Sequence, residues 1–176
     1  MEIILAENHG FCYGVKRAVE MANEAAEGKG KSYTLGPIIH NPQVVGRLES
    51  KGVSPIQEVA DIDEGTMIIR SHGVGPAIYA EAEEKGLHIL DATCPHVKKA
   101  QQDAKSVIED GMTLVILGEK NHPEVKSINL WANNKGIIIE DEESAKKLQI
   151  VEKMGVVVQT TFSQFKFNSI IEILEK

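Results

Sequence analysis

The sequence of 176 residues contains no long apolar run. No stretch approaches the roughly 20 apolar residues that a membrane-spanning helix needs. The opening residues Met-Glu-Ile-Ile-Leu also lack the basic segment and the long apolar core of a secretory signal peptide. We therefore expect a cytoplasmic protein that has no membrane partner.

Basic charge is also scarce, because 19 Lys and Arg residues stand against 26 Asp and Glu residues. No basic run is long enough to cover a face, so nucleic acid is not an expected partner. The sequence contains neither a Walker loop nor a G-x-G-x-x-G motif, and nucleotide binding is therefore not indicated. If the substrate is an anion, the chain must concentrate its positive groups locally.

Cysteine occurs only twice, at Cys12 and Cys94. In a cytoplasmic protein such a pair is expected to act as thiols, ligands or nucleophiles rather than as a structural disulfide. The ordinary interpretation of any single cysteine is a small buried apolar residue. A zinc site is a remote alternative, because no Cys-x-x-Cys pair exists.

Both cysteines occupy the same place in an internal repeat. Each is followed by two residues, a valine, two basic residues and an alanine, and each repeat then reaches a Leu-Gly pair at the same distance from its cysteine. A histidine follows each pair, at His40 and His122. Such self-similarity predicts a repeat architecture that brings equivalent loops to one centre.

Continuous Ile, Val and Leu runs alternate with helical patterns along the chain, which is typical of parallel sheets covered on both faces. We predict an α/β fold of two repeated units, 1–93 and 94–176, each a small parallel sheet flanked by helices. The expected strands are 2–6, 32–35, 53–56, 67–69, 87–90, 113–117, 136–139 and 156–158. The expected helices are 14–26, a helix from Pro42, 76–85, 95–110, 123–132, 142–148 and 165–174, with a short turn near 58–62.

Two features of the repeat predict a missing third unit. The second unit has no closing strand and no following cysteine, and the strand at 2–6 precedes Cys12 but belongs to neither unit. The chain is therefore expected to be two thirds of a pseudo-threefold trefoil, in which strand 2–6 pairs with the third unit. Without that unit, we expect either disorder before Cys12 or a strand swapped within a homodimer.

Ligands of parallel α/β folds bind beyond the carboxyl ends of the strands. Cys12 and Cys94 lie there, each at the start of a helix, a position that favours the thiolate. His40, His72 and His122 also follow strands, and three converging imidazoles suit a metal site or a phosphate site. Helix capping remains the alternative for each histidine taken singly.

Two further side chains are candidates for proton transfer and substrate binding. Glu124 stands two residues after His122, where the first repeat has a glutamine, as a unique proton donor would require. A first-turn glutamate that interacts with the helix dipole is equally compatible with this position. Thr160 ends a strand and could bind a substrate, although capping a helix is the ordinary role of such a hydroxyl.

Six segments carry a resemblance to a known family. They are Gly10–Val15, Ile39–Pro42, Arg70–Val74, Asp91–Pro95, Gly118–Val125 and Gln159–Thr161. Together they resemble the LytB family of 4-hydroxy-3-methylbut-2-enyl diphosphate reductases. The resemblance implies three α/β units around a 4Fe-4S cluster, which one cysteine from each unit holds.

The resemblance also implies roles for individual residues. Cys12 and Cys94 would be cluster ligands, His40, His72 and His122 would hold the substrate diphosphate, and Glu124 would protonate the departing hydroxyl, with Thr160 beside it. The family takes electrons from a ferredoxin or flavodoxin and makes isopentenyl and dimethylallyl diphosphates in the methylerythritol phosphate pathway. Because the third cysteine is missing, a catalytically silent fragment that retains part of a diphosphate cleft is the alternative.

Overall fold

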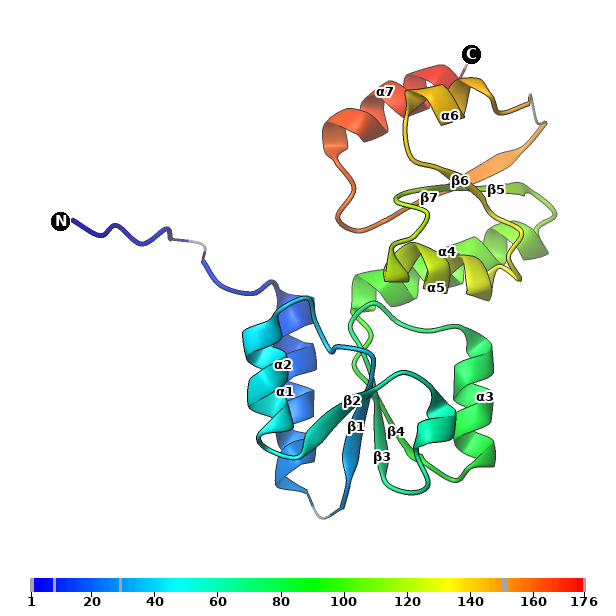
Figure 1. Cartoon of the computed structure of the whole chain (residues 1–176). Coiled ribbons are helices and arrows are strands. Elements are labelled where there is room, and N and C mark those ends of the chain that lie inside the picture. The colour runs from blue at the N-terminus through cyan, green and yellow to red at the C-terminus, as the bar shows by residue number, and fades with distance from the viewer. Residues whose placement is uncertain (1, 8, 29, 150–151, 176) are drawn as a thin grey trace.

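The computed structural model describes residues 2–7, 9–28, 30–149 and 152–175. Helices and strands alternate along the chain, and the strands form two parallel sheets (Figure 1). The elements of the first unit are α1 (Tyr13–Glu27), β1 (Ser32–Leu35), α2 (Pro42–Glu49), β2 (Val53–Ile56), the 3-10 turn η1 (Val59–Asp61), β3 (Thr66–Ile69), α3 (Pro76–Glu84) and β4 (His88–Asp91). Those of the second are α4 (Pro95–Glu109), β5 (Thr113–Leu117), α5 (Pro123–Trp131), β6 (Ile137–Ile139), α6 (Glu142–Lys146), β7 (Met154–Val158) and α7 (Gln164–Leu174).

The strand order is β2-β1-β3-β4 in the first sheet and β6-β5-β7 in the second. All neighbouring strands are parallel. Four helices begin at a proline, which has no amide hydrogen to leave unpaired at the first helical position. The α/β fold with small parallel sheets flanked by helices is thus confirmed.

Both faces of each sheet are covered, because alternate side chains of a strand point to opposite faces. In β3, Ile68 packs with residues of α1 and α2, whereas Met67 and Ile69 pack with residues of η1 and α3. In the second sheet, Ile116 packs under α4 and α5, and Leu117 packs with residues of α6 and α7. Figure 1 shows these helices on the two sides of each sheet.

Two hydrogen bonds join the units at the seam between α5 and the loop after β3. The hydroxyl of Ser127 lies 2.8 Å from the backbone oxygen of His72, and the indole Nε1 of Trp131 donates to the backbone oxygen of Val74 at 2.9 Å. Ser127 is buried and also accepts from Nε2 of Gln101 at 3.2 Å. The loop 70–74 is therefore held by the second unit.

Residues 2–6, predicted to form a strand that pairs with a third unit, form no strand within the described part of the chain, and that pairing stays a prediction. Ile3, Ile4 and Leu5 are 75%, 83% and 74% exposed, and the segment points away from the first unit (Figure 1). An extended segment needs a neighbouring strand to pair its backbone groups, and residues 2–6 pair with no strand of either sheet. No helix in the described part of the chain is both long and apolar enough to cross a membrane.

Candidate active site

One pocket of about 330 Å³ lies where the strand ends of both units meet. It is lined by all seven side chains selected from the sequence, namely Cys12, His40, His72, Cys94, His122, Glu124 and Thr160. The parallel topology explains this convergence, because the loops after β1, β3, β4, β5 and β7 leave the same ends of their sheets.

The three histidines form a compact cluster. The ring centroids of His40 and His72 are 4.6 Å apart, and His122 lies 5.4 Å from His72 and 6.0 Å from His40. One ring nitrogen from each lies within 4.8 Å of the others. This spacing suits three N–H donors around the oxygens of one anion.

His72 lies in surroundings that disfavour its charged form. Burial lowers the pKa of His72 from 6.5 to about 4, and the nearby His40, Arg70 and His122 act in the same direction. Its Nδ1 is buried and has no hydrogen-bond partner among the described residues. The imidazole is therefore neutral at pH 7.

His122 has a tautomer fixed by the helix that it caps. Its Nδ1 accepts a hydrogen bond from the backbone N–H of Glu124 at 3.2 Å, at the start of α5. A neutral imidazole with an accepting Nδ1 carries its proton on Nε2. His122 thus caps a helix and also presents an N–H donor, so the two interpretations of its role are compatible.

Glu124 is only 2% exposed, and both of its carboxylate oxygens are paired with Thr160. Oε1 accepts from the backbone N–H of Thr160 at 2.6 Å, and Oε2 accepts from its hydroxyl at 2.9 Å. A backbone N–H can only donate, whereas a hydroxyl can donate or accept. Oε2 is therefore the oxygen that can hold a proton while its bond to Thr160 is kept.

The two cysteines are the N-cap residues of α1 and α4, and neither uses its side chain as a cap. Cys12 is exposed and Cys94 is partly buried. A Cβ atom built on Gly14 would lie 2.5 Å from Sγ of Cys94, so the first turn of α1 packs directly against the second cysteine. Arg17 of α1 reinforces this approach by donating to the backbone oxygens of Asp91 and Thr93.

A comparison with known protein families covers almost the whole chain. Residues 3–176 match the family described as LytB protein. The chain belongs to the LytB family. It is 49% identical to the 4-hydroxy-3-methylbut-2-enyl diphosphate reductase of Geobacter metallireducens, with 100% of this chain and 63% of the relative covered. For the reductase of Caldanaerobacter subterraneus, the identity is 45% and the coverage is 99% and 62%.

Two solved structures of reductases are similar as well. One, of (E)-4-hydroxy-3-methyl-but-2-enyl diphosphate reductase, gives a TM-score of 0.84 at 43% identity and covers 98% of this chain and 63% of that one. The Plasmodium falciparum E-1-hydroxy-2-methyl-but-2-enyl-4-diphosphate reductase gives 0.91 at 32% identity, with 96% and 54% covered. This LytB chain thus spans less than two thirds of the length of these relatives.

Some features of this LytB pocket were not predicted from the sequence. Phe11, Asn41 and Ser71 also line it. Ser127 does not line it, but its hydroxyl contacts the backbone oxygens of His72 and Glu124, which do. Ser127 lies one helical turn after Glu124, and this i, i+3 spacing was the only available signal. The remaining histidines, His9, His88 and His96, are exposed and do not line the pocket.

Proposed function

We propose that this chain is part of an iron–sulfur reductase that converts 4-hydroxy-3-methylbut-2-enyl diphosphate into isopentenyl and dimethylallyl diphosphates. The observation that carries the proposal is the convergence of two thiols, three imidazoles and a buried carboxylate in one pocket. The reaction consumes two electrons and two protons and releases the hydroxyl as water. An external ferredoxin or flavodoxin is the proposed electron donor.

The donor set fits part of a 4Fe-4S site. Thiolates are the usual protein ligands of such clusters, and Cys12 and Cys94 bring two of them to the pocket. A cluster held at three corners needs one more thiolate, which these 176 residues do not contain. When bound, the cluster would supply the electrons of the reduction. The third ligand must therefore come from outside this sequence.

The histidines are proposed to bind the diphosphate. His122 offers Nε2–H, and the His72 ring beside it lines the same pocket. Binding of a negative group favours protonated imidazole, so the pKa of His72 should rise from about 4 in the complex. Burial at this site makes each hydrogen bond stronger than it would be in water.

Glu124 is proposed to deliver a proton to the departing hydroxyl. Its Oε2 would carry the proton, since Oε1 is committed to the backbone N–H of Thr160. The Thr160 hydroxyl can turn from donor to acceptor when Oε2 is protonated, which keeps the carboxyl group in place. The hydroxyl of Thr160 thus positions the acid and stays in contact with the pocket.

The two-cysteine count favours a second candidate function for the chain alone, namely diphosphate binding without a cluster.

The reductase proposal is tested with a fusion of this chain to the part of the Geobacter metallireducens reductase that it does not match. After anaerobic loading with iron and sulfide, the fusion should convert the substrate to C5 diphosphates with a chemical reductant. Cys12→Ala and Cys94→Ala variants should lose both iron and turnover.

The unfused chain provides the comparison. It should bind inorganic pyrophosphate in calorimetry, and it should retain little iron after desalting. A folded, iron-loaded fusion that forms no C5 product would disprove the reductase proposal. Retention of a stoichiometric cluster by the unfused chain would instead disprove the need for a third ligand.

A further inference from the structure

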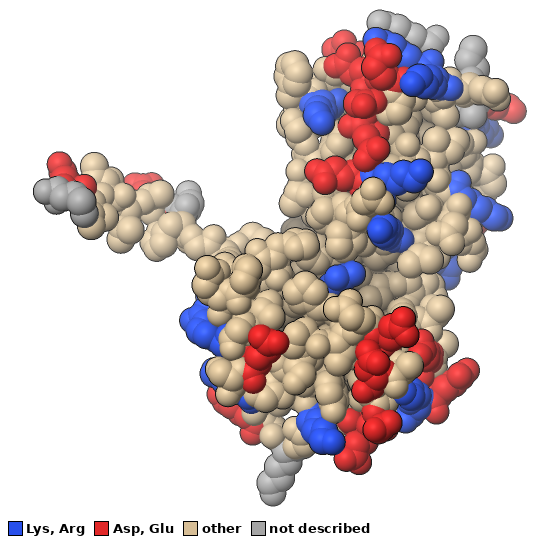
Figure 2. Space-filling model, viewed as in Figure 1, with Lys and Arg blue, Asp and Glu red and all other residues tan. Residues whose placement is uncertain are grey.

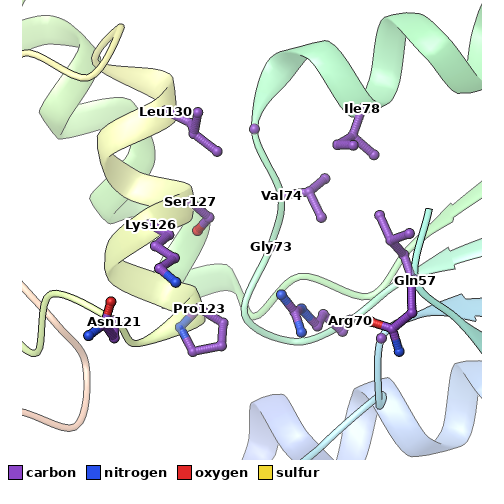
Figure 3. A pocket seen from close by; sticks show the side chains of 13 residues that line it. Gln57, Arg70, Gly73, Val74, Ile78, Asn121, Pro123, Lys126, Ser127 and Leu130 are labelled. Atoms are coloured by element: carbon purple, nitrogen blue, oxygen red, sulfur yellow. The ribbon is translucent and has the colours of Figure 1, made fainter. Parts of the chain in front are cut away.

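A second pocket of about 330 Å³ lies on the seam between the two units, and it shares no lining residue with the histidine pocket (Figure 3). The loop 70–74 and the start of α5 form its walls, and the same two segments carry His72 and His122 into the other pocket. Residues from both units therefore build this second pocket.

The charged side chains that line this pocket are all basic. Arg70 and Lys126 are its two cations, and no Asp or Glu is among the thirteen lining residues. Within the described chain, neither cation forms an ion pair with a carboxylate. In a chain of net charge −7, two unpaired cations in one hollow are a local exception. The middle of the face in Figure 2 agrees, with basic side chains at the seam and acidic ones gathered above and below it.

Arg70 is held in place although its guanidinium lacks an anionic partner. Its Nε is buried and has no hydrogen-bond partner among the described residues, and burial lowers the pKa of the guanidinium below its usual value. An arginine nevertheless stays charged at neutral pH. Gly36 has φ of +72°, which favours glycine, and a Cβ built there would lie 2.8 Å from Nη1 of Arg70, so the guanidinium packs closely against this turn. A buried cation in such a setting is stabilised by an anion.

The other end of the pocket is apolar. Val74, Ile78 and Leu130 stand opposite the polar end formed by Arg70 and Lys126 (Figure 3). Leu130 is 43% exposed. A ligand that covered these three side chains would gain about 25 cal/mol for each Å² of apolar surface removed from water.

We propose that this pocket binds a small phosphate monoester with a short apolar tail. The phosphate lies between Arg70 and Lys126, and the tail contacts Val74, Ile78 and Leu130. A dianionic phosphate matches two cations, and the planar guanidinium pairs with two phosphate oxygens at once. A carboxylate, with a single charge, leaves one cation unmatched. The volume lies within the usual range of small-molecule sites, about 300–1,000 Å³.

The test is an NMR titration of the chain with pentyl phosphate. The amides of Gly75 and Leu130 report on the seam pocket, and those of Asn41 and Thr161 report on the histidine pocket, so each protein provides its own internal control. Lys126→Gln and Arg70→Gln should weaken the binding seen at Gly75 by roughly tenfold or more, the usual value of a charged hydrogen bond. For Lys126→Gln, the response at Asn41 should be unchanged.

Matched variants test whether binding of pentyl phosphate depends on the residues of the pocket or only on the net charge of the protein. Lys126 is exposed, so its replacement leaves the core intact even if the Arg70 variant folds poorly. Lys126→Arg should retain binding, and Lys135→Gln, at an exposed lysine outside both pockets, should bind as wild type does. Inorganic phosphate and hexanoate should each bind more weakly than pentyl phosphate.

Four results would overturn the proposal. Pentyl phosphate could shift only the Asn41 and Thr161 amides, or it could bind Lys126→Gln as tightly as wild type. Equal binding of hexanoate would rule out phosphate selectivity, and equal binding of inorganic phosphate would rule out the apolar contact.

Discussion

The hydroxyl of Ser127 lies 2.8 Å from the backbone carbonyl oxygen of His72, and this contact ties α5 of the second unit to a histidine of the first. The hydroxyl oxygen of Ser127 also lies 2.9 Å from the carbonyl oxygen of Glu124. One buried hydroxyl thus fixes the backbone of two proposed substrate-site residues that belong to different units.

Ser127→Ala should lower the free energy of unfolding by about 1–3 kcal/mol, because Nε2 of Gln101 and the His72 carbonyl lose a buried partner. Urea unfolding measures this change. Ser106→Ala, at an exposed serine of α4, is the control and should change stability by less than about 0.5 kcal/mol. Equal effects of the two variants would contradict the bridging role.

Thr160→Val should destabilise the protein by about 1–3 kcal/mol, since Oε2 of the buried Glu124 loses its donor. Thr160→Ser keeps the hydroxyl and should recover most of the loss. In the fusion described above, the valine variant should also lose turnover, whereas the serine variant should retain it. A valine variant as stable as wild type would show that the hydroxyl does not hold Glu124.

Gly14→Ala should destabilise the protein although alanine is the better helix former, because the new methyl group would lie 2.5 Å from Sγ of Cys94. Gly46→Ala, in α2 with no heavy atom within 4 Å of the new Cβ, should instead stabilise it by up to about 1 kcal/mol. Thermal unfolding compares the pair. Removing Sγ by Cys94→Ala should relieve much of the Gly14→Ala defect, and no relief would argue against this contact.

His72 should make stability depend on pH. Its pKa is about 4 in the folded chain and about 6.5 when unfolded, so the unfolded state binds more protons between these values. The contribution is fully present above about pH 6.5 and is lost as the pH falls toward 4. It amounts to roughly 3 kcal/mol at most. His72→Asn should therefore flatten the rise of unfolding free energy between pH 4 and 7.

NMR titration of the assigned His72 ring checks the cause directly. A midpoint near 6.5 in the folded protein would contradict the effect of burial. Saturation with inorganic pyrophosphate should move the midpoint upward, because the bound anion favours the protonated ring.

The sequence predicted the fold well because its signals are local. Prolines start α2, α3, α4 and α5, and apolar runs mark β3, β5, β6 and β7. The residues of the histidine pocket could also be predicted from the sequence, because the loops that follow parallel strands lie at the same edge of a sheet. The strand at 2–6 could not be settled in this way, because an apolar run becomes a strand only where another strand pairs with it.

Contacts across the seam were not predictable from the sequence for a different reason. Ser127 and Arg70 look like ordinary polar residues, and their roles depend on side-chain directions and on how the two units pack. Nothing in the repeat pattern indicates that Arg70 lacks a carboxylate partner or that Gly36 makes room for it. Such relations appear only when the packed side chains are known.

The chain's single tryptophan gives this seam an optical signature. Trp131 donates its indole hydrogen to Val74 across the boundary and lies edge-on to Tyr79, with ring centroids 6.1 Å apart. Any separation of the two units would transfer this indole to water and shift its emission to longer wavelength, while the circular dichroism of both sheets stays constant. The emission of Trp131 therefore reports whether the two units that build both pockets are held together.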